Sequence, residues 1–322
     1  QLLRNAGVRV SGINDAVDVA VGGTHACALR NGGRVSCWGS NDEGQLGNGS
    51  TGFSSPTPVD VVGITDATAI AAGSQHTCAV LADYTVQCWG RNGNGQVGVS
   101  AESTTTPATV PGLDLVTEVA LGNSHTCARR ATGDVWCWGY GYDGQLGNGE
   151  TGPDAAINTT PVPVTGLDDV VEIDADNLHT CARRDDGTVA CWGAGRCYQL
   201  GQGSASDSAV PVAVAGVSGA TAITAGGSHS CALFDDAPAQ CWGADGQGQA
   251  GNGLDGHINF DQPYPVDVVN GEGFLDISAG LTHTCALFWT YTAVCWGDNE
   301  YGQLGDEGTT DRSNPLRLVQ AG

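Results

Sequence analysis

One short pattern recurs six times along this chain of 322 residues. Each copy has a histidine, a cysteine two residues later, a second cysteine ten residues after the first, and then a Trp-Gly pair. The first cysteine recurs every 49 to 54 residues, by subtraction of its positions along the sequence. Repetition at such a period is typical of propellers, solenoids and arrays. The repeat therefore organises the whole chain, and we expect no boundary between different domains.

Within a repeat, apolar and polar residues alternate with a period of two, which predicts short strands. The first repeat has four such segments, "AVDVAVGG", "HACALRNGG", "RVSCWGS" and "PTPVDVVGI". Stretches rich in Gly, Asn and Asp separate them, as turns require. No stretch has a convincing helical period. Four antiparallel strands in every repeat of about fifty residues predict an all-β fold, a single β-propeller of four-stranded blades.

The repeat also resembles that of a known family. Its string G-x-x-H-[TS]-C-A-L, followed by C-W-G and then G-Q-[LVA]-G, is similar to the repeat of the regulator of chromosome condensation family, from about Asp15 to Pro315. This resemblance implies a β-propeller, which in the family most often has seven blades. We count six full repeats and predict six blades. The alternative is a seven-bladed ring with one blade missing or incomplete.

We expect one propeller domain over residues 1–322. The N-terminal "GVRVSGI" is similar to "PVDVVGI" of the first repeat. The resemblance implies that this strand, at about 7–13, closes the ring by strand exchange. The predicted repeats are about 15–63, 64–113, 114–167, 168–217, 218–271 and 272–322.

The two cysteines of each repeat lie symmetrically about a tight turn, so they should face each other on adjacent strands. Such neighbours are close enough for a disulfide. We therefore predict six disulfides, which favour an oxidising compartment. The predicted pairs are Cys27 with Cys37, Cys78 with Cys88, Cys127 with Cys137, Cys181 with Cys191, Cys231 with Cys241, and Cys285 with Cys295.

The alternatives are free thiols or a zinc site built from one histidine and two cysteines in each repeat. A structural zinc site needs a fourth ligand, and no further Cys, His or acidic residue recurs nearby. We interpret the repeated histidine as a hydrogen-bonding residue of the blade core. We expect the repeated tryptophan to pack between blades, and Gly-Gln-Leu-Gly to form a turn with a buried aliphatic residue.

The formal net charge is −23, and every one of the twelve basic residues is an arginine. Such a chain repels the phosphates of nucleic acids and anionic lipids. No apolar run reaches the length that spans a membrane. We therefore expect neither a nucleic-acid partner nor membrane insertion. From the predicted disulfides we expect a localisation outside the cell, at the cell surface or in the periplasm.

Function is best sought where the repeats differ. The sixth repeat has Phe288, Trp289 and Tyr291 at a hairpin tip that holds Asn and Gly in the first. Exposed aromatics on a rigid hairpin are good binding anchors. The alternative for these residues is packing against the closing strand or a neighbouring loop.

The third and fourth repeats contain four arginines, which could meet an anionic partner or pair within the chain with Asp134, Asp185 or Asp186. These arginines are Arg129, Arg130, Arg183 and Arg184. In the third repeat, Tyr140 and Tyr142 are further candidate binding residues.

The fourth repeat leaves Cys197 without a partner, which indicates either a disulfide-linked dimer or a buried thiol. The longest loops, "NGETGPDAAINTTPVPV" and "NGLDGHINFDQPYPVDV", carry residues suited to carbohydrate or calcium, including His257, Phe260 and Tyr264. They lack the ordered spacing of an EF-hand, so we predict no cofactor and no metal site, with calcium only weakly supported.

No catalytic constellation stands apart from the repeats. The leading hypothesis is a non-catalytic extracellular binding or adhesion scaffold, with a protein or glycan partner on one face of the ring. One alternative is a secreted inhibitor of an extracellular enzyme, because similar repeats form a secreted propeller that inhibits a β-lactamase through aromatic-rich loops. The others are a lectin-like propeller and an enzyme, a hydrolase or lyase, with a metal bound in a loop.

Overall fold

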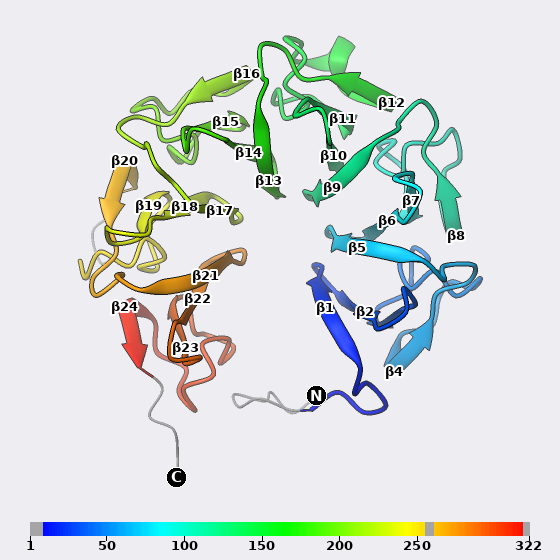
Figure 1. The fold of residues 1–322 in the computed structure, drawn as a ribbon, viewed down its shortest axis with the longest axis horizontal. Coiled ribbons are helices and arrows are strands. Elements are labelled where there is room, and N and C mark those ends of the chain that lie inside the picture. The colour runs from blue at the N-terminus through cyan, green and yellow to red at the C-terminus, as the bar shows by residue number, and fades with distance from the viewer. Residues whose placement is uncertain (1–8, 255–260, 318–322) are drawn as a thin grey trace. The chain divides into compact units, whose positions relative to one another are not determined.

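The computed structural model describes residues 9–254 and 261–317. These residues form six antiparallel sheets of four strands each (Figure 1). The chain is therefore an all-β, six-bladed propeller, as the repeat predicted. We number the sheets 1 to 6 in chain order.

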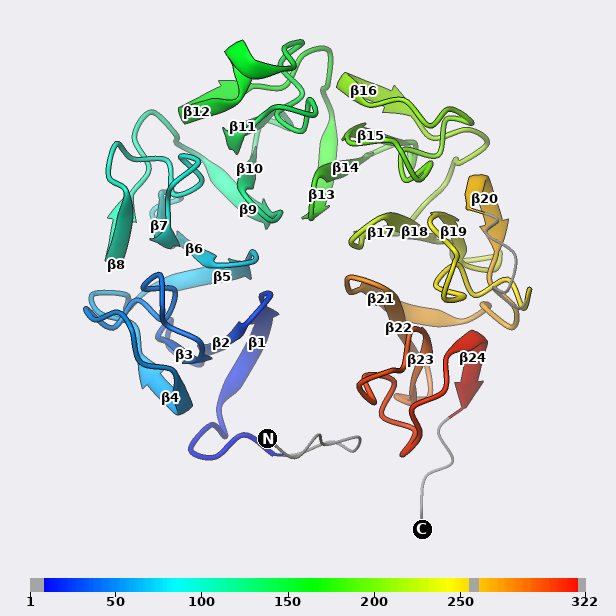
Figure 2. The same cartoon turned by 180° about the vertical axis from the view of Figure 1, so that it is seen from behind.

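Contacts divide the chain into two compact units. An N-terminal unit comprises Val10–Leu178 and Ala209–Pro211. A C-terminal unit comprises His179–Ser208 and Val212–Gly322, together with Gln1–Arg9. Within each unit the sheets follow one another in chain order (Figures 1 and 2).

The first thirteen strands and one short 3-10 helix, η1, belong to the N-terminal unit. Their bounds are β1 (Ala16–Val21), β2 (His25–Arg30), β3 (Val35–Gly39), β4 (Ser55–Asp60), β5 (Ala67–Ala72), β6 (His76–Leu81), β7 (Val86–Arg91), β8 (Ser103–Thr109), β9 (Val116–Leu121), β10 (His125–Arg130), β11 (Val135–Tyr140), η1 (Pro153–Ala155), β12 (Ile157–Pro163) and β13 (Val170–Asp176).

The later strands belong to the C-terminal unit, apart from the middle of β16. Their bounds are β14 (His179–Arg184), β15 (Val189–Gly193), β16 (Ser208–Ala213), β17 (Ala222–Ala225), β18 (His229–Leu233), β19 (Gln240–Gly243), β20 (Gln262–Asp267), β21 (Phe274–Ala279), β22 (His283–Phe288), β23 (Ala293–Gly297) and β24 (Arg312–Arg317). Each sheet takes four consecutive strands in order, from β1-β2-β3-β4 to β21-β22-β23-β24.

The four strands predicted for the first repeat correspond to β1 to β4 and are confirmed. The strand expected at about 7–13 lies partly outside the described residues, and residues 9–13 form no strand. The fourth strand of sheet 6 is β24, near the C-terminal end of the described chain. The role of residues 7–13 in closing the propeller stays a prediction.

The second and third strands of each sheet form a hairpin that brings the two cysteines of the repeat face to face. In sheet 1, Cys27 pairs with Cys37 in the strand register, and their Cα atoms are 4.0 Å apart. The register between β3 and β4 shifts between Cys37 and Gly39, which marks a bulge at the Trp-Gly pair. Gly39 has a positive φ, and a Cβ there would lie 2.6 Å from the carbonyl oxygen of Thr24. The sequence needs glycine after the tryptophan for this reason.

The hydrophobic core lies between neighbouring sheets. Between sheets 1 and 2, Leu46 and Val61 pack with Ile70, Ala79 and Trp89, and all five side chains are buried. Similar clusters lie between sheets 2 and 3, sheets 4 and 5, and sheets 5 and 6. Within each unit, neighbouring sheets therefore bury apolar side chains against each other, as expected for stacked repeats. Among the residues placed in the structure, no helix is long and apolar enough to cross a membrane.

Candidate functional site

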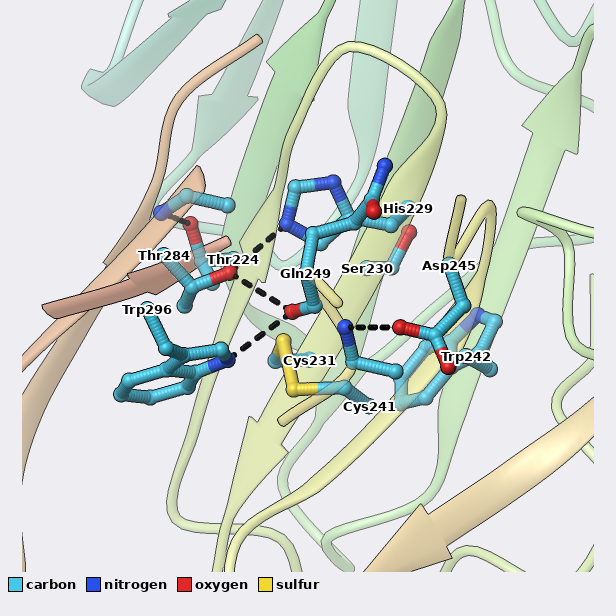
Figure 3. Close-up of a disulfide and its surroundings, with 12 residues drawn as sticks. Thr224, His229, Ser230, Cys231, Cys241, Trp242, Asp245, Gln249, Thr284 and Trp296 are labelled. Atoms are coloured by element: carbon cyan, nitrogen blue, oxygen red, sulfur yellow. Dashed lines mark hydrogen bonds between the residues drawn. A yellow bond between two sulfur atoms is a disulfide. The ribbon is translucent and has the colours of Figure 1, made fainter. Parts of the chain in front are cut away.

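A hydrogen-bonded link joins neighbouring sheets, and Figure 3 shows it between sheets 5 and 6. His229 Nε2 lies 2.8 Å from Thr284 Oγ1. The Thr284 hydroxyl donates to the backbone oxygen of Gln249 at 3.1 Å. Trp296 Nε1 donates to the same oxygen at 2.9 Å. The Gln249 carbonyl, in the Gly-Gln-Ala-Gly turn of sheet 5, is thus held by two side chains of sheet 6.

The same link occurs at three further interfaces within the two units. In each, a Thr or Ser stands directly after the histidine of the later repeat. Its hydroxyl accepts a hydrogen bond from the histidine of the earlier repeat and donates one to the backbone carbonyl of a glutamine. The same carbonyl accepts a second hydrogen bond from a tryptophan. The sets are His25, Thr77, Gln45 and Trp89; His76, Thr126, Gln96 and Trp138; and His179, Ser230, Gln199 and Trp242.

The link fixes the protonation state of the histidines. Because the hydroxyl gives its single hydrogen to the glutamine carbonyl, it can only accept from histidine, so Nε2 carries the proton. Nδ1 of His25 has no hydrogen-bond partner among the residues that the structure describes, and burial disfavours a charged ring. Burial lowers the pKa of His76 to about 3 and that of His25 to about 4. A neutral, buried and repeated histidine is a structural residue.

The expectation of a buried, hydrogen-bonding histidine is confirmed, and the structure adds that the bond runs to the next sheet. A glycine three residues earlier makes this bond possible. A Cβ on Gly73 would lie 2.4 Å from Cε1 of His76, so only glycine lets the ring lie across the backbone and reach sheet 3.

The repeated tryptophans pack between sheets, as expected, at five of six positions. Trp89, Trp138, Trp192, Trp242 and Trp296 are fully buried. Trp38 of the first repeat is only half-buried.

All twelve repeat cysteines form disulfides in the pairs that the spacing predicted, with Cα atoms 4.0 to 4.1 Å apart. The two sulfurs of each pair are bonded to each other, so neither is a thiolate that could bind zinc.

The hairpin between β22 and β23 carries the aromatic residues of the sixth repeat. Trp289 is 67% exposed and Tyr291 is 80% exposed. Phe288 was expected to be exposed with them, and this is wrong. It is buried because its ring packs on Phe274, with ring centroids 4.7 Å apart.

A hollow of about 360 Å³ lies beside this hairpin. It is lined by Asn270, Glu272, Phe288, Val294 and Pro315. The residues come from the loop before β21, from the facing ends of β22 and β23, and from β24. The hollow combines an apolar wall with one exposed carboxylate, Glu272.

The arginines of the third repeat pair within the chain. Arg130 makes ion pairs with Asp134, as predicted, at 3.1 Å and with Asp114. Arg129 pairs instead with Glu118, at 2.7 Å. Burial raises the pKa of Glu118, and the hydrogen bond from Arg129 opposes this shift. These arginines stabilise sheet 3 and leave little charge for a partner.

In the fourth repeat, Arg183 Nη1 donates to the carbonyl oxygen of Ala220 at 3.5 Å. The pKa of Asp186 is lowered chiefly by hydrogen bonds from Thr188 and to a smaller extent by the charge of Arg184. At this hairpin Arg184 therefore acts on Asp186 through its charge.

Two other departures from the repeat lie at the end of β11 and in the loop between β15 and β16. Tyr140 and Tyr142 stack, with ring centroids 6.3 Å apart, and Tyr142 is 43% exposed. Cys197 is a free, half-buried cysteine, and burial raises the pKa of its thiol. A role in binding for the tyrosines and a Cys197-linked dimer stay predictions.

The two long loops place few of their candidate residues. His257 and Phe260 lie outside the described residues. Tyr264 is 56% exposed, and a Cβ on Gly203 would lie 2.3 Å from its hydroxyl oxygen. In the described ranges, no three His, Cys, Asp or Glu residues form a group that could hold a metal ion.

Sequence reasoning missed Glu272 and the hollow that it lines. The signal lay in aligning the repeats on their histidines. Five residues after the histidine, the first and third repeats have Arg30 and Arg130, whereas the sixth has Phe288. Eleven residues before it, the third repeat has Asp114 and the sixth has Glu272.

The stacked four-stranded sheets and the repeated link define a propeller built from one repeated unit. The family model described as the RCC1-like domain matches residues 4–321. The chain belongs to this family.

Two relatives illustrate the similarity in sequence. The ultraviolet-B receptor UVR8 of Arabidopsis thaliana is 31% identical over 309 residues, which is 94% of this chain and 58% of the relative. The regulator of chromosome condensation of Drosophila melanogaster is 35% identical over 96 residues, or 29% of this chain and 18% of the relative. The chain thus spans little more than half of the first relative and less of the second.

Solved structures show the same fold. Yeast RCC1 (Prp20), bound to Kap60, has a TM-score of 0.84 at 24% identity, over 95% of this chain and 75% of that one. Human WBSCR16 has a TM-score of 0.87 at 22% identity, over 99% of this chain and 86% of that one.

Proposed function

We propose that this chain is a non-catalytic protein-binding module that works in an oxidising compartment, at the cell surface or elsewhere outside the cytoplasm. RCC1-like propellers are typically protein-binding scaffolds. The observation that carries the compartment is the disulfide in each of the six sheets. Disulfides persist in secreted and periplasmic proteins and are rare in the cytosol.

Two observations support a protein partner. The hairpin between β22 and β23 exposes Trp289 and Tyr291 on a rigid sheet, and such aromatics are common anchors of protein interfaces. Prp20p of Saccharomyces cerevisiae, whose solved structure has a similar fold, binds Gsp1p and histones. The repeated histidines and cysteines, in contrast, are used in packing and are not available for chemistry.

The compartment is tested by counting thiols in protein isolated from its natural source with thiols blocked at lysis. We expect one reactive thiol, that of Cys197, and twelve more only after reduction. Twelve or more reactive thiols before reduction would refute the proposed compartment.

The binding surface is tested by photocrosslinking on intact cells or culture medium from that source. A photoreactive amino acid is placed at Trp289 or Tyr291, and at Tyr301 as a control that is also 60% exposed in sheet 6. We expect one protein to be crosslinked from the hairpin and not from Tyr301. Crosslinking of equal strength from all three positions would contradict a hairpin surface.

A further inference from the structure

An arginine occupies one particular place in sheet 3, beside the hairpin between β10 and β11. Arg130, the last residue of β10, reaches back to the loop before β9. Its Nε donates to the carbonyl oxygen of Asp114 at 3.0 Å, and its Nη2 pairs with the Asp114 carboxylate. Asp134 holds Nη1 at 3.1 Å. Asp114 and Asp134 thus form a binding site for the guanidinium group of Arg130.

Sheet 1 fills the same place in a similar way. Arg30 is the last residue of β2, and its Nε pairs with Asp15 at 2.9 Å. Its Nη1 lies 3.9 Å from Asp60. Sheets 1 and 3 thus each hold an arginine from the hairpin against a carboxylate from the loop before the sheet, at positions that differ by one residue.

Sheet 6 has the carboxylate and lacks the arginine. Glu272 stands at the position of Asp114, eleven residues before the histidine. Phe288 stands at the position of Arg130, and its ring turns inward onto Phe274. Both Glu272 and Phe288 line the hollow of about 360 Å³. Glu272 is exposed and has no ion pair or hydrogen bond with residues 9–254 and 261–315, the ranges in which side chains are described.

We propose that this hollow binds an arginine side chain of a partner protein, which takes the place that Arg130 fills in sheet 3. Its guanidinium pairs with Glu272, and its aliphatic stem lies along Phe288, Val294 and Pro315. Trp289 and Tyr291, exposed on the adjoining hairpin tip, offer ring faces for the planar guanidinium.

The charge of the chain favours the same partner. With a net charge of −23 and no lysine, the protein attracts basic segments. Arginine suits the hollow better than lysine because its planar fork matches a carboxylate and stacks on aromatic rings. The inference rests on the proposed protein-binding function and names the chemistry that its partner presents.

The test is calorimetric titration of the intact, oxidised protein with three blocked tripeptides. Each has glycine on both sides of a central arginine, lysine or citrulline, which is a neutral analogue of arginine. We expect saturable binding of the arginine peptide, at least threefold weaker binding of the lysine peptide and at least tenfold weaker binding of the citrulline peptide.

Variants place the binding in the hollow. Glu272→Gln should weaken the arginine peptide at least tenfold, and Trp289→Ala about threefold to fivefold. Both side chains are exposed, so the melting temperature should stay within about 1 °C of wild type. Asp185→Asn is the control, because it removes an exposed carboxylate from the corresponding hairpin of sheet 4, and it should leave binding unchanged.

Four results would overturn the inference: no saturable binding, equal binding of citrulline, equal binding of lysine, or a loss in Asp185→Asn as large as that in Glu272→Gln. These outcomes are separate from the tests of the proposed function. A single reactive thiol and a crosslinked partner would leave that function standing even if no arginine peptide bound.

Discussion

The link between sheets 2 and 3 predicts what happens when one hydroxyl is removed. Thr126 is fully buried, accepts from His76 Nε2 at 2.9 Å and donates to the Gln96 carbonyl oxygen at 2.9 Å. Thr126→Val keeps the shape of the side chain and removes both bonds. The Gln96 oxygen keeps its bond from Trp138, at 2.9 Å, whereas the His76 donor is left unsatisfied.

The magnitude follows from these bonds. An unsatisfied buried donor costs about 1–3 kcal/mol, and the lost bond to Gln96 about 1 kcal/mol. The additional buried methyl group returns about 0.8 kcal/mol. We therefore expect Thr126→Val to lower the free energy of unfolding by about 1–3 kcal/mol. The melting temperature should fall by about 2–4 °C.

Two matched variants separate the link from the loss of any hydroxyl. Thr126→Ser should cost less than about 1 kcal/mol, because Ser230 makes the same two bonds, at 2.9 and 3.1 Å, between sheets 4 and 5. Thr117→Val removes a half-buried hydroxyl that donates to the backbone carbonyl oxygen of Arg129 at 3.3 Å, and it should cost less than about 0.5 kcal/mol.

The assay is urea unfolding of the oxidised protein at pH 7, followed by tryptophan fluorescence and by circular dichroism. If Thr126→Val stays within about 0.5 kcal/mol of wild type, or if Thr126→Ser is as unstable as Thr126→Val, the hydroxyl does not hold the two sheets together and the reasoning fails.

Three more perturbations test other parts of the structure. The pKa of His76 and of His229 is lowered to about 3 in the folded protein, so from pH 6.5 downward the unfolded chain binds protons first. Each histidine should then remove about 1.4 kcal/mol from the free energy of unfolding per pH unit below 6.5. Urea unfolding at pH 7, 6 and 5 measures this loss, and an unchanged free energy would mean that the rings are already charged in the folded protein. Gly73→Ala places a Cβ 2.4 Å from His76 Cε1 and should cost more than about 3 kcal/mol or prevent folding, whereas Gly93→Ala, whose nearest contact is at 4.0 Å, should stay soluble with a melting temperature near wild type. Because burial raises the pKa of Cys197, its alkylation at pH 7 should be slower than that of glutathione, and an equal rate would contradict the half-buried thiol.

The sequence predicted those features that rest on the spacing of residues. Two cysteines placed symmetrically about a turn can only face each other in a hairpin, so Cys27 and Cys37 were paired correctly. The strands of the first repeat followed from alternation. The hydrogen-bonding partner of His25 could not be predicted, because Thr77 lies 52 residues away and its other partner is a backbone carbonyl, which any residue type supplies.

The candidate site was predicted only in part. Aromatic residues in place of Asn and Gly indicated a distinct hairpin, and Trp289 and Tyr291 are indeed exposed. Composition did not show that Phe288 turns inward, because this depends on the neighbouring ring of Phe274. The hollow beside Glu272 is the space left by that turn, so it depends on packing between three segments.

The short disulfide loops also determine how the chain responds to mechanical force. Each disulfide joins cysteines ten residues apart within one hairpin, and no disulfide among the described residues joins two sheets. A pulled chain can therefore lose its sheets separately, since apart from the connecting backbone only non-covalent contacts hold one sheet to the next. After a sheet has unfolded, its disulfide keeps the segment between the two cysteines from extending. The unfolded sheet is therefore about 30–35 Å shorter than the same segment fully extended without the disulfide. Reduction would release this length, so the disulfides limit how far the protein stretches.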